Sequence, residues 1–240
     1  MLLSACVSID RQPASLPDVD SSIVPRKNIT IAMLGATGMA GGFIVQEALA
    51  QGYDIRALAR TPQKLYALKD QITIVEGDAR DHSTIDMLLQ GSNIVISALG
   101  PTKADGDASK TISTTATGHI IQLMPAHNIN RYILVSGAAV DVSGDERNLT
   151  GWLIQKMAFL ALHDTVKDKQ AEYQLLADSY IQWTLVRCPL IKDKPFKHQP
   201  KTSLVTPSSF SLRAGELAHF MIEQINSGEF IKKAPFLESQ

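Results

Sequence analysis

Short apolar runs alternate with longer amphipathic stretches along most of the chain. The apolar runs have the length of buried strands, and they cover residues 29–34, 53–59, 71–75, 93–99, 131–135 and 181–187. The stretches between them repeat apolar residues at helical spacing, from Met39, Pro62, Ser83 and Thr111 onward and over residues 151–178. Strands that alternate with helices through short connections build a parallel sheet that is covered on both faces. The pattern therefore predicts an α/β fold with a doubly wound parallel sheet.

Local signals indicate where several of these helices begin and end. Gly52 stands where a left-handed residue ends the first helix. Ser83 and Asp86 have the spacing of a capping box, with Asp in place of the usual Glu. The long helical region 151–178 is expected to break near His163 and Asp164.

The last fifty residues are rich in proline and then turn helical. An amphipathic helix is predicted over residues 211–225, and a short apolar segment follows at 234–237. This portion is too short for a separate domain, so we expect it to cover the carboxyl edge of the sheet, where such folds bind ligands. Residues 28–240 are thus one domain, after a leader over residues 1–27 whose prolines and polar residues predict disorder.

Charge and composition narrow the classes of partner. The chain of 240 residues has 23 basic and 24 acidic residues and a net charge of −1, so no nucleic-acid or anionic-membrane footprint is visible. Cys6 and Cys188 are the two cysteines, too few and too far apart for a disulfide framework or a thiolate metal site. The six histidines show no metal-ligand spacing. A small-molecule ligand without a metal is therefore favoured, and no feature of the sequence indicates an oligomeric state.

The N-terminus leaves two locations open. Residues 3–6 match the short consensus at which bacterial lipoprotein signals are cut, with Cys6 as the acylated residue. Only five residues precede Cys6, without a basic region or a proper apolar stretch. We therefore expect a cytoplasmic protein, with lipid anchoring through Cys6 as the alternative if the true start lies upstream. The fairly apolar window 29–51 contains four glycines and the polar Gln46, Glu47 and Gln51, which argue against a membrane span.

Glycines at 35, 38 and 41 lie between the first strand and the first helix. In a strand-to-helix turn the first glycine permits the tight turn, the second lets the backbone approach a pyrophosphate, and the third lets the helix pack on the sheet. The unpaired N–H groups at the start of the helix, near Thr37, Met39 and Ala40, favour phosphate. A glycine pattern alone is also compatible with a flexible loop. Its place between a strand and a helix, with a second strand following, predicts a dinucleotide site on a Rossmann-type fold.

The ends of the second and third strands are expected to contact the adenosine half of that dinucleotide. Arg60, with Lys64 one helical turn further on, is suited to the 2′-phosphate of NADP(H), whereas a carboxylate would select NAD. Arg60 is otherwise a solvated charge at a strand end. Asp78 is a candidate acceptor for the adenine amino group with Ala79 beside the ring, and a loop-capping aspartate is the competing interpretation.

Several motifs together resemble one family. They are Gly35-Ala-Thr-Gly-Met-Ala-Gly41, Ala59-Arg60, Glu76-Gly-Asp78, Ser97-Ala-Leu-Gly100, Tyr132-Ile-Leu-Val-Ser136 and Trp183-Thr-Leu-Val-Arg187. Over residues 28–238 the chain resembles the atypical short-chain dehydrogenases/reductases of the NAD(P)H-binding, NmrA-like group, which includes flavin and biliverdin reductases and cofactor-sensing regulators. The resemblance implies that Leu99 and Gly100 also line the cofactor.

The resemblance implies a catalytic set that this chain keeps only in part. In the wider family a serine after the fifth strand acts with a tyrosine four residues before a lysine, and Ser136 and Lys169 match the serine and the lysine. The residue four before Lys169 is Thr165, whose hydroxyl is too weak an acid to replace a phenol. Tyr173 lies four residues after Lys169, one turn the wrong way. Lys169 is equally compatible with a solvated lysine in a charged helix.

Other candidates for proton transfer are weaker. His163 and Asp164 are near the expected helix break, although a histidine in this position is more often a packed or capping residue. Cys188 follows the sixth strand, where a free cysteine is usually just buried. Two functions remain: an NADPH-dependent reductase of a flavin, quinone or similar acceptor that takes its proton from water, or a non-catalytic NADP(H)-sensing regulator or scaffold.

Overall fold

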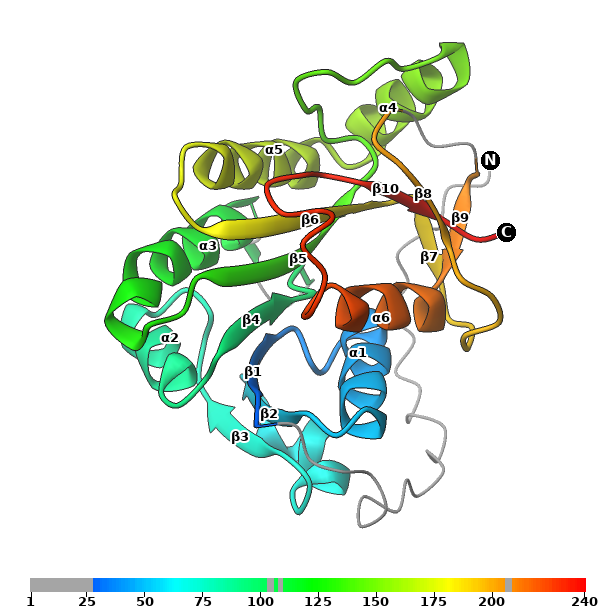
Figure 1. The fold of residues 1–240 in the computed structure, drawn as a ribbon. Helices are drawn as coiled ribbons and strands as arrows, with labels where there is room; N and C mark the ends of the chain where they lie inside the picture. The colour runs from blue at the N-terminus through cyan, green and yellow to red at the C-terminus, as the bar shows by residue number, and fades with distance from the viewer. Residues whose placement is uncertain (1–27, 103–105, 108–109, 206–208) are drawn as a thin grey trace.

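The computed structural model describes residues 28–102, 106–107, 110–205 and 209–240 (Figure 1). The predicted leader over residues 1–27, including Cys6, lies outside these residues. The described part forms one α/β unit in which a twisted sheet is sandwiched between two layers of helices (Figure 1).

Eight strands form the main sheet of the described residues, in the order β3-β2-β1-β4-β5-β6-β10-β8. These strands are β1 (Thr30–Leu34), β2 (Asp54–Ala59), β3 (Thr73–Glu76), β4 (Ile94–Ser97), β5 (Arg131–Gly137), β6 (Gln182–Cys188), β8 (Lys201–Ser203) and β10 (Phe236–Glu238). Every neighbouring pair is parallel except β10 with β8. Strand β1 pairs with both β2 and β4, so the chain reverses direction across the sheet at β1. The crevice at the carboxyl ends of β1 and β4 is where such sheets bind ligands.

Helices cover both faces of the sheet, as predicted. They are α1 (Met39–Ala50), the 3₁₀ helix η1 (Pro62–Leu68), α2 (His82–Leu89), α3 (Ile112–Leu123), the 3₁₀ helix η3 (Met124–His127), α4 (Leu149–Ala161), α5 (His163–Ala177) and α6 (Ala214–Glu223). One apolar core joins α1 and α6 to the sheet, and a second joins α2, α3 and α5 to its other face (Figure 1). The doubly wound Rossmann-type fold is confirmed.

Helix boundaries follow the local signals with one correction. Gly52 and Gly91 have left-handed φ values of 80° and 70° just after α1 and α2, as their lack of a β-carbon allows. The predicted capping box at Ser83 and Asp86 is wrong, because Asp81 caps α2 by accepting a hydrogen bond from Ser83 N. An aspartate two residues earlier reaches the free N–H groups directly.

The C-terminal residues, which were expected only to cover the carboxyl edge of the sheet, also contribute strands β8 and β10 to it. Strand β10 pairs with β6, and α6 packs against α1, while β7 (Leu190–Lys192) and β9 (Ser211–Arg213) form a separate parallel pair (Figure 1). The first residues of the predicted helix 211–225 therefore form a strand, and the helix begins at Ala214. Within the described ranges, no helix combines the length and the hydropathy that crossing a bilayer requires.

Candidate functional site

The glycine turn after β1 permits three close approaches of backbone. Gly35 has a φ of 78°, and a β-carbon there would lie 2.6 Å from the carbonyl oxygen of Ala98, just after β4. A β-carbon on Gly41 would lie 2.0 Å from the oxygen of Gly35, closer than any real contact allows. Gly38 N donates to Gly35 O at 3.0 Å and closes the turn. A side chain at 35 would therefore collide with the backbone that follows β4, and one at 41 would push α1 away from the turn.

The N-terminus of α1 is open to an anionic ligand. Its cap residue Gly38 offers no side-chain acceptor, and the first turn holds no acidic residue. Thr37, Gly38 and Met39 are exposed, and Ala40 is half-buried. The first N–H groups of a helix lack partners inside the helix and lie at the positive end of its dipole. This helix start therefore fits a pyrophosphate, as the glycine spacing predicts.

The N-terminus of α3, at the same edge of the sheet, already binds a carboxylate of the protein. Buried Asp168 of α5 accepts hydrogen bonds from Ser113 N at 2.8 Å and Thr114 N at 2.9 Å, and from Thr114 Oγ1 at 2.6 Å. Its negative charge occupies the place a phosphate would take. Of these two helix starts, α1 is thus the one without a bound carboxylate of the protein.

The end of β2 presents two exposed cations. Arg60 follows the last strand residue, and its Nη2 donates to Thr102 Oγ1 at 3.1 Å. Lys64 is exposed on η1. The positive charge of Arg60 also acts on Asp78, since it helps to lower the pKa of that carboxyl. A cationic surface therefore lies at the end of β2, where the resemblance expects the adenosine ribose.

Asp78 is held by its own neighbour. Both of its carboxylate oxygens accept from the Arg80 guanidinium, at 2.9 and 2.5 Å, and Oδ1 also accepts from Arg80 N. The hydrogen bonds from Arg80 lower the Asp78 pKa to about 2. These contacts match the loop-capping interpretation, while adenine recognition by Asp78 stays a prediction. Ala79 is buried in the second core.

Lys169 is buried, so the interpretation of it as a solvated surface lysine is wrong. Its Nζ donates to Leu99 O at 3.0 Å, to Val135 O at 3.2 Å and to Glu172 Oε2 at 2.9 Å. An ammonium group has three donors, and all three are engaged here. Lys169 therefore joins the carboxyl ends of β4 and β5, and it brings the predicted residue Leu99 to this edge. Gly100 follows in the same loop and is half-buried.

A buried polar network behind Lys169 was not predicted from the sequence. Glu172 also accepts from Thr117 Oγ1 at 2.8 Å, and that hydroxyl lies 3.1 Å from the Tyr132 oxygen. Burial raises the pKa of Tyr132, so its hydroxyl stays protonated. The one local signal was the three-residue spacing of Lys169 and Glu172, which places them on one helix face.

Ser136 lies near the end of β5 with an unpartnered hydroxyl. The residue is 4% exposed, and its Oγ has no hydrogen-bond partner among the described residues. Buried hydroxyls are normally hydrogen-bonded, so an unpaired one points to a missing ligand or water. Tyr132 and Leu134 of β5 pack into the core on the α5 side, and by strand alternation Ser136 faces that same side. The structure thus brings Ser136 and Lys169 to one end and one face of the sheet.

The other candidates for proton transfer are placed differently. Tyr173 is half-buried and packs edge-on against the ring of Trp183, with centroids 6.0 Å apart. His163 is exposed at the start of α5, where its Nδ1 lies 3.0 Å from Asp164 Oδ1. The predicted helix break is present just before it, between α4 and α5. Burial raises the pKa of Cys188, which makes its thiol unreactive. Thr165 is half-buried on α5.

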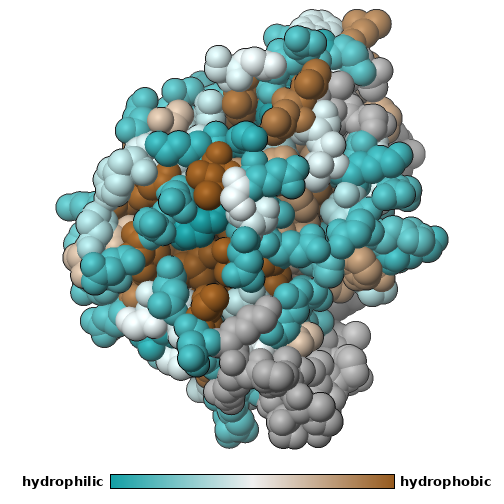
Figure 2. Space-filling model, in the orientation of Figure 1, coloured by the Kyte–Doolittle hydropathy of each residue, from teal (hydrophilic) through white to brown (hydrophobic). Residues whose placement is uncertain are grey.

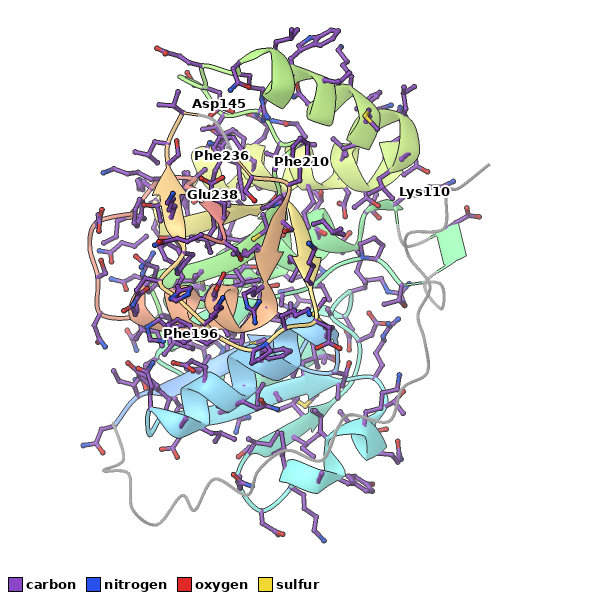
Figure 3. The ribbon with its side chains drawn as sticks, turned by 90° about the vertical axis from the view of Figure 1, so that its right-hand side faces the viewer. Lys110, Asp145, Phe196, Phe210, Phe236 and Glu238 are labelled. Atoms are coloured by element: carbon purple, nitrogen blue, oxygen red, sulfur yellow. The ribbon has the colours of Figure 1, made fainter. Side chains whose placement is uncertain are left out.

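A second buried ion pair fixes the loop after β5, and sequence reasoning missed it. Arg187 of β6 is 1% exposed and donates to both carboxylate oxygens of Asp145, at 2.5 and 2.8 Å. Its guanidinium lies over the ring of Phe236 at 3.6 Å, next to which Figure 3 shows Asp145. Burial lowers the Arg187 pKa, against the opposing effect of Asp145. The pair ties the loop to β6, and the Arg187 guanidinium also contacts Phe236 of β10.

No group of three or more histidine, cysteine or carboxylate side chains within the described ranges has a geometry that could hold a metal ion.

A family model with the description NAD(P)H-binding matches residues 35–228. The chain belongs to this NAD(P)H-binding family. The family match covers the glycine turn, the cations after β2 and the Lys169 network alike.

Solved structures and a curated relative are also similar. ChuY, the anaerobillin reductase of Escherichia coli, has a TM-score of 0.72 and is 19% identical, over 87% of this chain and 96% of ChuY. A short-chain dehydrogenase/reductase of Veillonella parvula in complex with NADP has a TM-score of 0.69 and is 15% identical, over 88% and 94% of the two chains. Photosystem II assembly factor Ycf39 of Trieres chinensis is 28% identical over 114 residues, which are 47% of this chain and 36% of that protein. The match thus spans about a third of that curated relative's length. The expected likeness to atypical short-chain dehydrogenases/reductases is confirmed.

Proposed function

We propose that this chain is an NADPH-dependent reductase that passes a hydride to a flavin, quinone or similar small acceptor. The observation that carries the proposal is the uncapped start of α1 above the Gly35–Gly41 turn, beside Ala98 and within the family match. When bound, the nicotinamide supplies the hydride. The protein supplies orientation and a site from which water is excluded.

The phosphate preference rests on the charges at the end of β2. Arg60 and Lys64 favour the extra phosphate of NADPH, and a guanidinium pairs with phosphate oxygens through two donors. A similar fold has been solved with NADP, which agrees with this choice.

The acceptor is one that needs no strong acid from the protein. Thr165 stands where the resemblance expects the tyrosine, and Tyr173 packs against Trp183 instead. A flavin, a quinone or a tetrapyrrole can take its proton from water. ChuY is named an anaerobillin reductase, so acceptors of that kind belong in the panel to be tested.

A second candidate function is that of a non-catalytic NADP(H)-sensing regulator or scaffold. The observation that favours it is the occupation of all three donors of Lys169 by internal acceptors, which leaves none for a nicotinamide ribose. The name of Ycf39, an assembly factor, agrees with such a role. For either function we expect a cytoplasmic location, with lipid anchoring through Cys6 as the alternative that mass analysis of the native protein tests.

Two measurements test the proposal. Purified protein with NADPH and a panel of flavins, quinones and tetrapyrroles should oxidise the nicotinamide with at least one acceptor. NADPH binding without oxidation by any of them would refute the reductase and support the sensor.

Arg60→Ala tests the cofactor assignment. We expect it to raise the Kd for NADPH by roughly 10–100-fold, the loss of one or two charge-assisted hydrogen bonds, and to change the Kd for NADH little. Lys69→Ala, an exposed cation at the far end of η1, is the control. An equal loss for both cofactors would show that Arg60 does not bind the 2′-phosphate.

A further inference from the structure

Helix α4 leaves six large apolar side chains exposed. The exposed fractions are 81% for Leu149, 50% for Trp152, 52% for Leu153, 62% for Met157, 40% for Phe159 and 85% for Leu160. At about 100° per residue these six side chains fall on one side of the helix, with Leu149 and Leu160 near its centre. Figure 1 shows α4 at the periphery, and Figure 2 shows hydrophobic residues at the surface of that end of the molecule.

The opposite side of α4 carries the small and polar residues and contacts the protein. Gly151 is buried, Ala158 is half-buried, and Gln155 Nε2 donates to Ala139 O at 3.1 Å. A surface helix normally buries its apolar side and exposes its polar side. In α4 the arrangement is reversed, and an exposed apolar face of this kind marks an interaction surface.

The charges of α4 argue for a protein partner over a membrane. Lys156 is the single charged residue of the helix; at about 100° per residue it falls on the same side as the exposed apolar residues, where its Nζ lies 5.7 Å from the centre of the Trp152 ring. Helices that lie on membranes carry a strongly charged polar face, and binding to anionic lipids requires a cluster of basic residues. Helix α4 has neither.

The area and the symmetry of this face fit a second copy of the chain. At these exposed fractions the six residues together present roughly 800 Å² of surface to solvent. Each partner buries about this much in a standard protein–protein interface. In a twofold dimer the same surface meets itself, so it must be self-complementary. Leu149 and Leu160, about three turns apart, lie at the two ends of the face. Two antiparallel copies would thus place Leu149 of one against Leu160 of the other.

We propose that the outward face of α4 is the interface of a homodimer. This inference goes beyond the reductase function and does not rest on it.

Sedimentation velocity of the full chain from about 1 to 100 μM tests this proposal, since standard interfaces reach micromolar affinity or better. We expect the wild-type protein to be a dimer at about 100 μM, and to dissociate toward about 1 μM if its affinity is only micromolar. Leu160→Glu should remain monomeric throughout this range, because we expect it to raise the dissociation constant of the dimer at least 100-fold over the wild-type value. Because Leu160 is 85% exposed, the substitution should leave the Tm and the Kd for NADPH unchanged.

Tyr180→Glu is the matched control, because Tyr180 is 64% exposed and lies outside α4. It should dimerise as the wild type does. A wild-type protein that stays monomeric at 100 μM would overturn the proposal, as would a Leu160→Glu variant that dimerises normally. Binding to vesicles of phosphatidylcholine and phosphatidylglycerol is measured as well. A wild-type protein that is monomeric and binds these vesicles would show that α4 contacts a membrane and not a second copy of the chain.

Discussion

Removal of the Lys169 ammonium should expose how much the fold depends on its buried ion pair. Lys169→Met keeps most of the side-chain volume and leaves Glu172 as an uncompensated charge that is 1% exposed. It also removes the donor to Leu99 O and Val135 O. The cost should therefore include both the unpaired carboxylate and the loss of one hydrogen bond at each of two carbonyls.

The magnitude follows from known costs of these defects. Breaking a buried ion pair by removing one partner costs about 3–5 kcal/mol. Glu172→Gln keeps an acceptor for Thr117 but leaves the Lys169 ammonium as an uncompensated buried charge, so its cost should fall in the same range. In the double variant neither charge remains, so we expect its cost to fall short of the sum of the two by up to roughly 3 kcal/mol.

The wild type, the two single variants and the double variant form a double-mutant cycle, which urea unfolding at neutral pH measures. The Kd for NADPH is determined by titration of each folded protein. The expected result is a large coupling in the free energy of unfolding, with Kd values for NADPH within about tenfold of the wild type. Additive costs would refute the pairing. If the expected coupling is found but Lys169→Met alone loses more than tenfold in NADPH affinity, the result would support a contact between Lys169 and the nicotinamide ribose.

Two further predictions concern the glycine turn and Asp78. Gly41→Ala should lower stability by about 2 kcal/mol or more and weaken NADPH, because its methyl group would lie 2.0 Å from Gly35 O. Gly42→Ala, whose methyl group meets nothing within 4 Å, should raise the Tm as an ordinary helix substitution, and equal losses at both positions would contradict this. The Asp78 pKa of about 2 lies below its unfolded value, so the stability it adds is fully present above about pH 4 and is lost as the pH falls toward 2. The stability difference between the wild type and Asp78→Asn should thus narrow between about pH 4 and pH 2, and a difference that stays constant over this range would rule this out.

Most of the fold could be predicted because its central strands are buried on both faces. Such strands appear in the sequence as continuous apolar runs, and the boundaries of β1, β2 and β6 fall within a residue or two of those runs. Strand β10 could not be predicted from the sequence, since it has three residues and pairs with Arg187 about fifty positions earlier. A strand of that length has no periodicity to detect.

The site could be predicted where the backbone itself makes it and less well where distant side chains do. The glycine turn is local, so its spacing was sufficient. Asp168 and Lys169 look like part of a solvated charged helix, yet both are buried. Their partners, Ser113 and Leu99, are 55 and 70 residues away in the chain, and no local pattern contains them.

The packing of α6 on α1 sets an order of events during protein synthesis. Residues 214–223 cover the helix whose first turn is expected to hold the phosphates, although that helix leaves the ribosome some 170 residues earlier. The N-terminal segments of a growing chain emerge first and must wait for later contacts. We therefore expect the nascent chain to keep an apolar side of α1 uncovered until residues 214–223 have been made. Stable cofactor binding by the growing chain should begin only after that point.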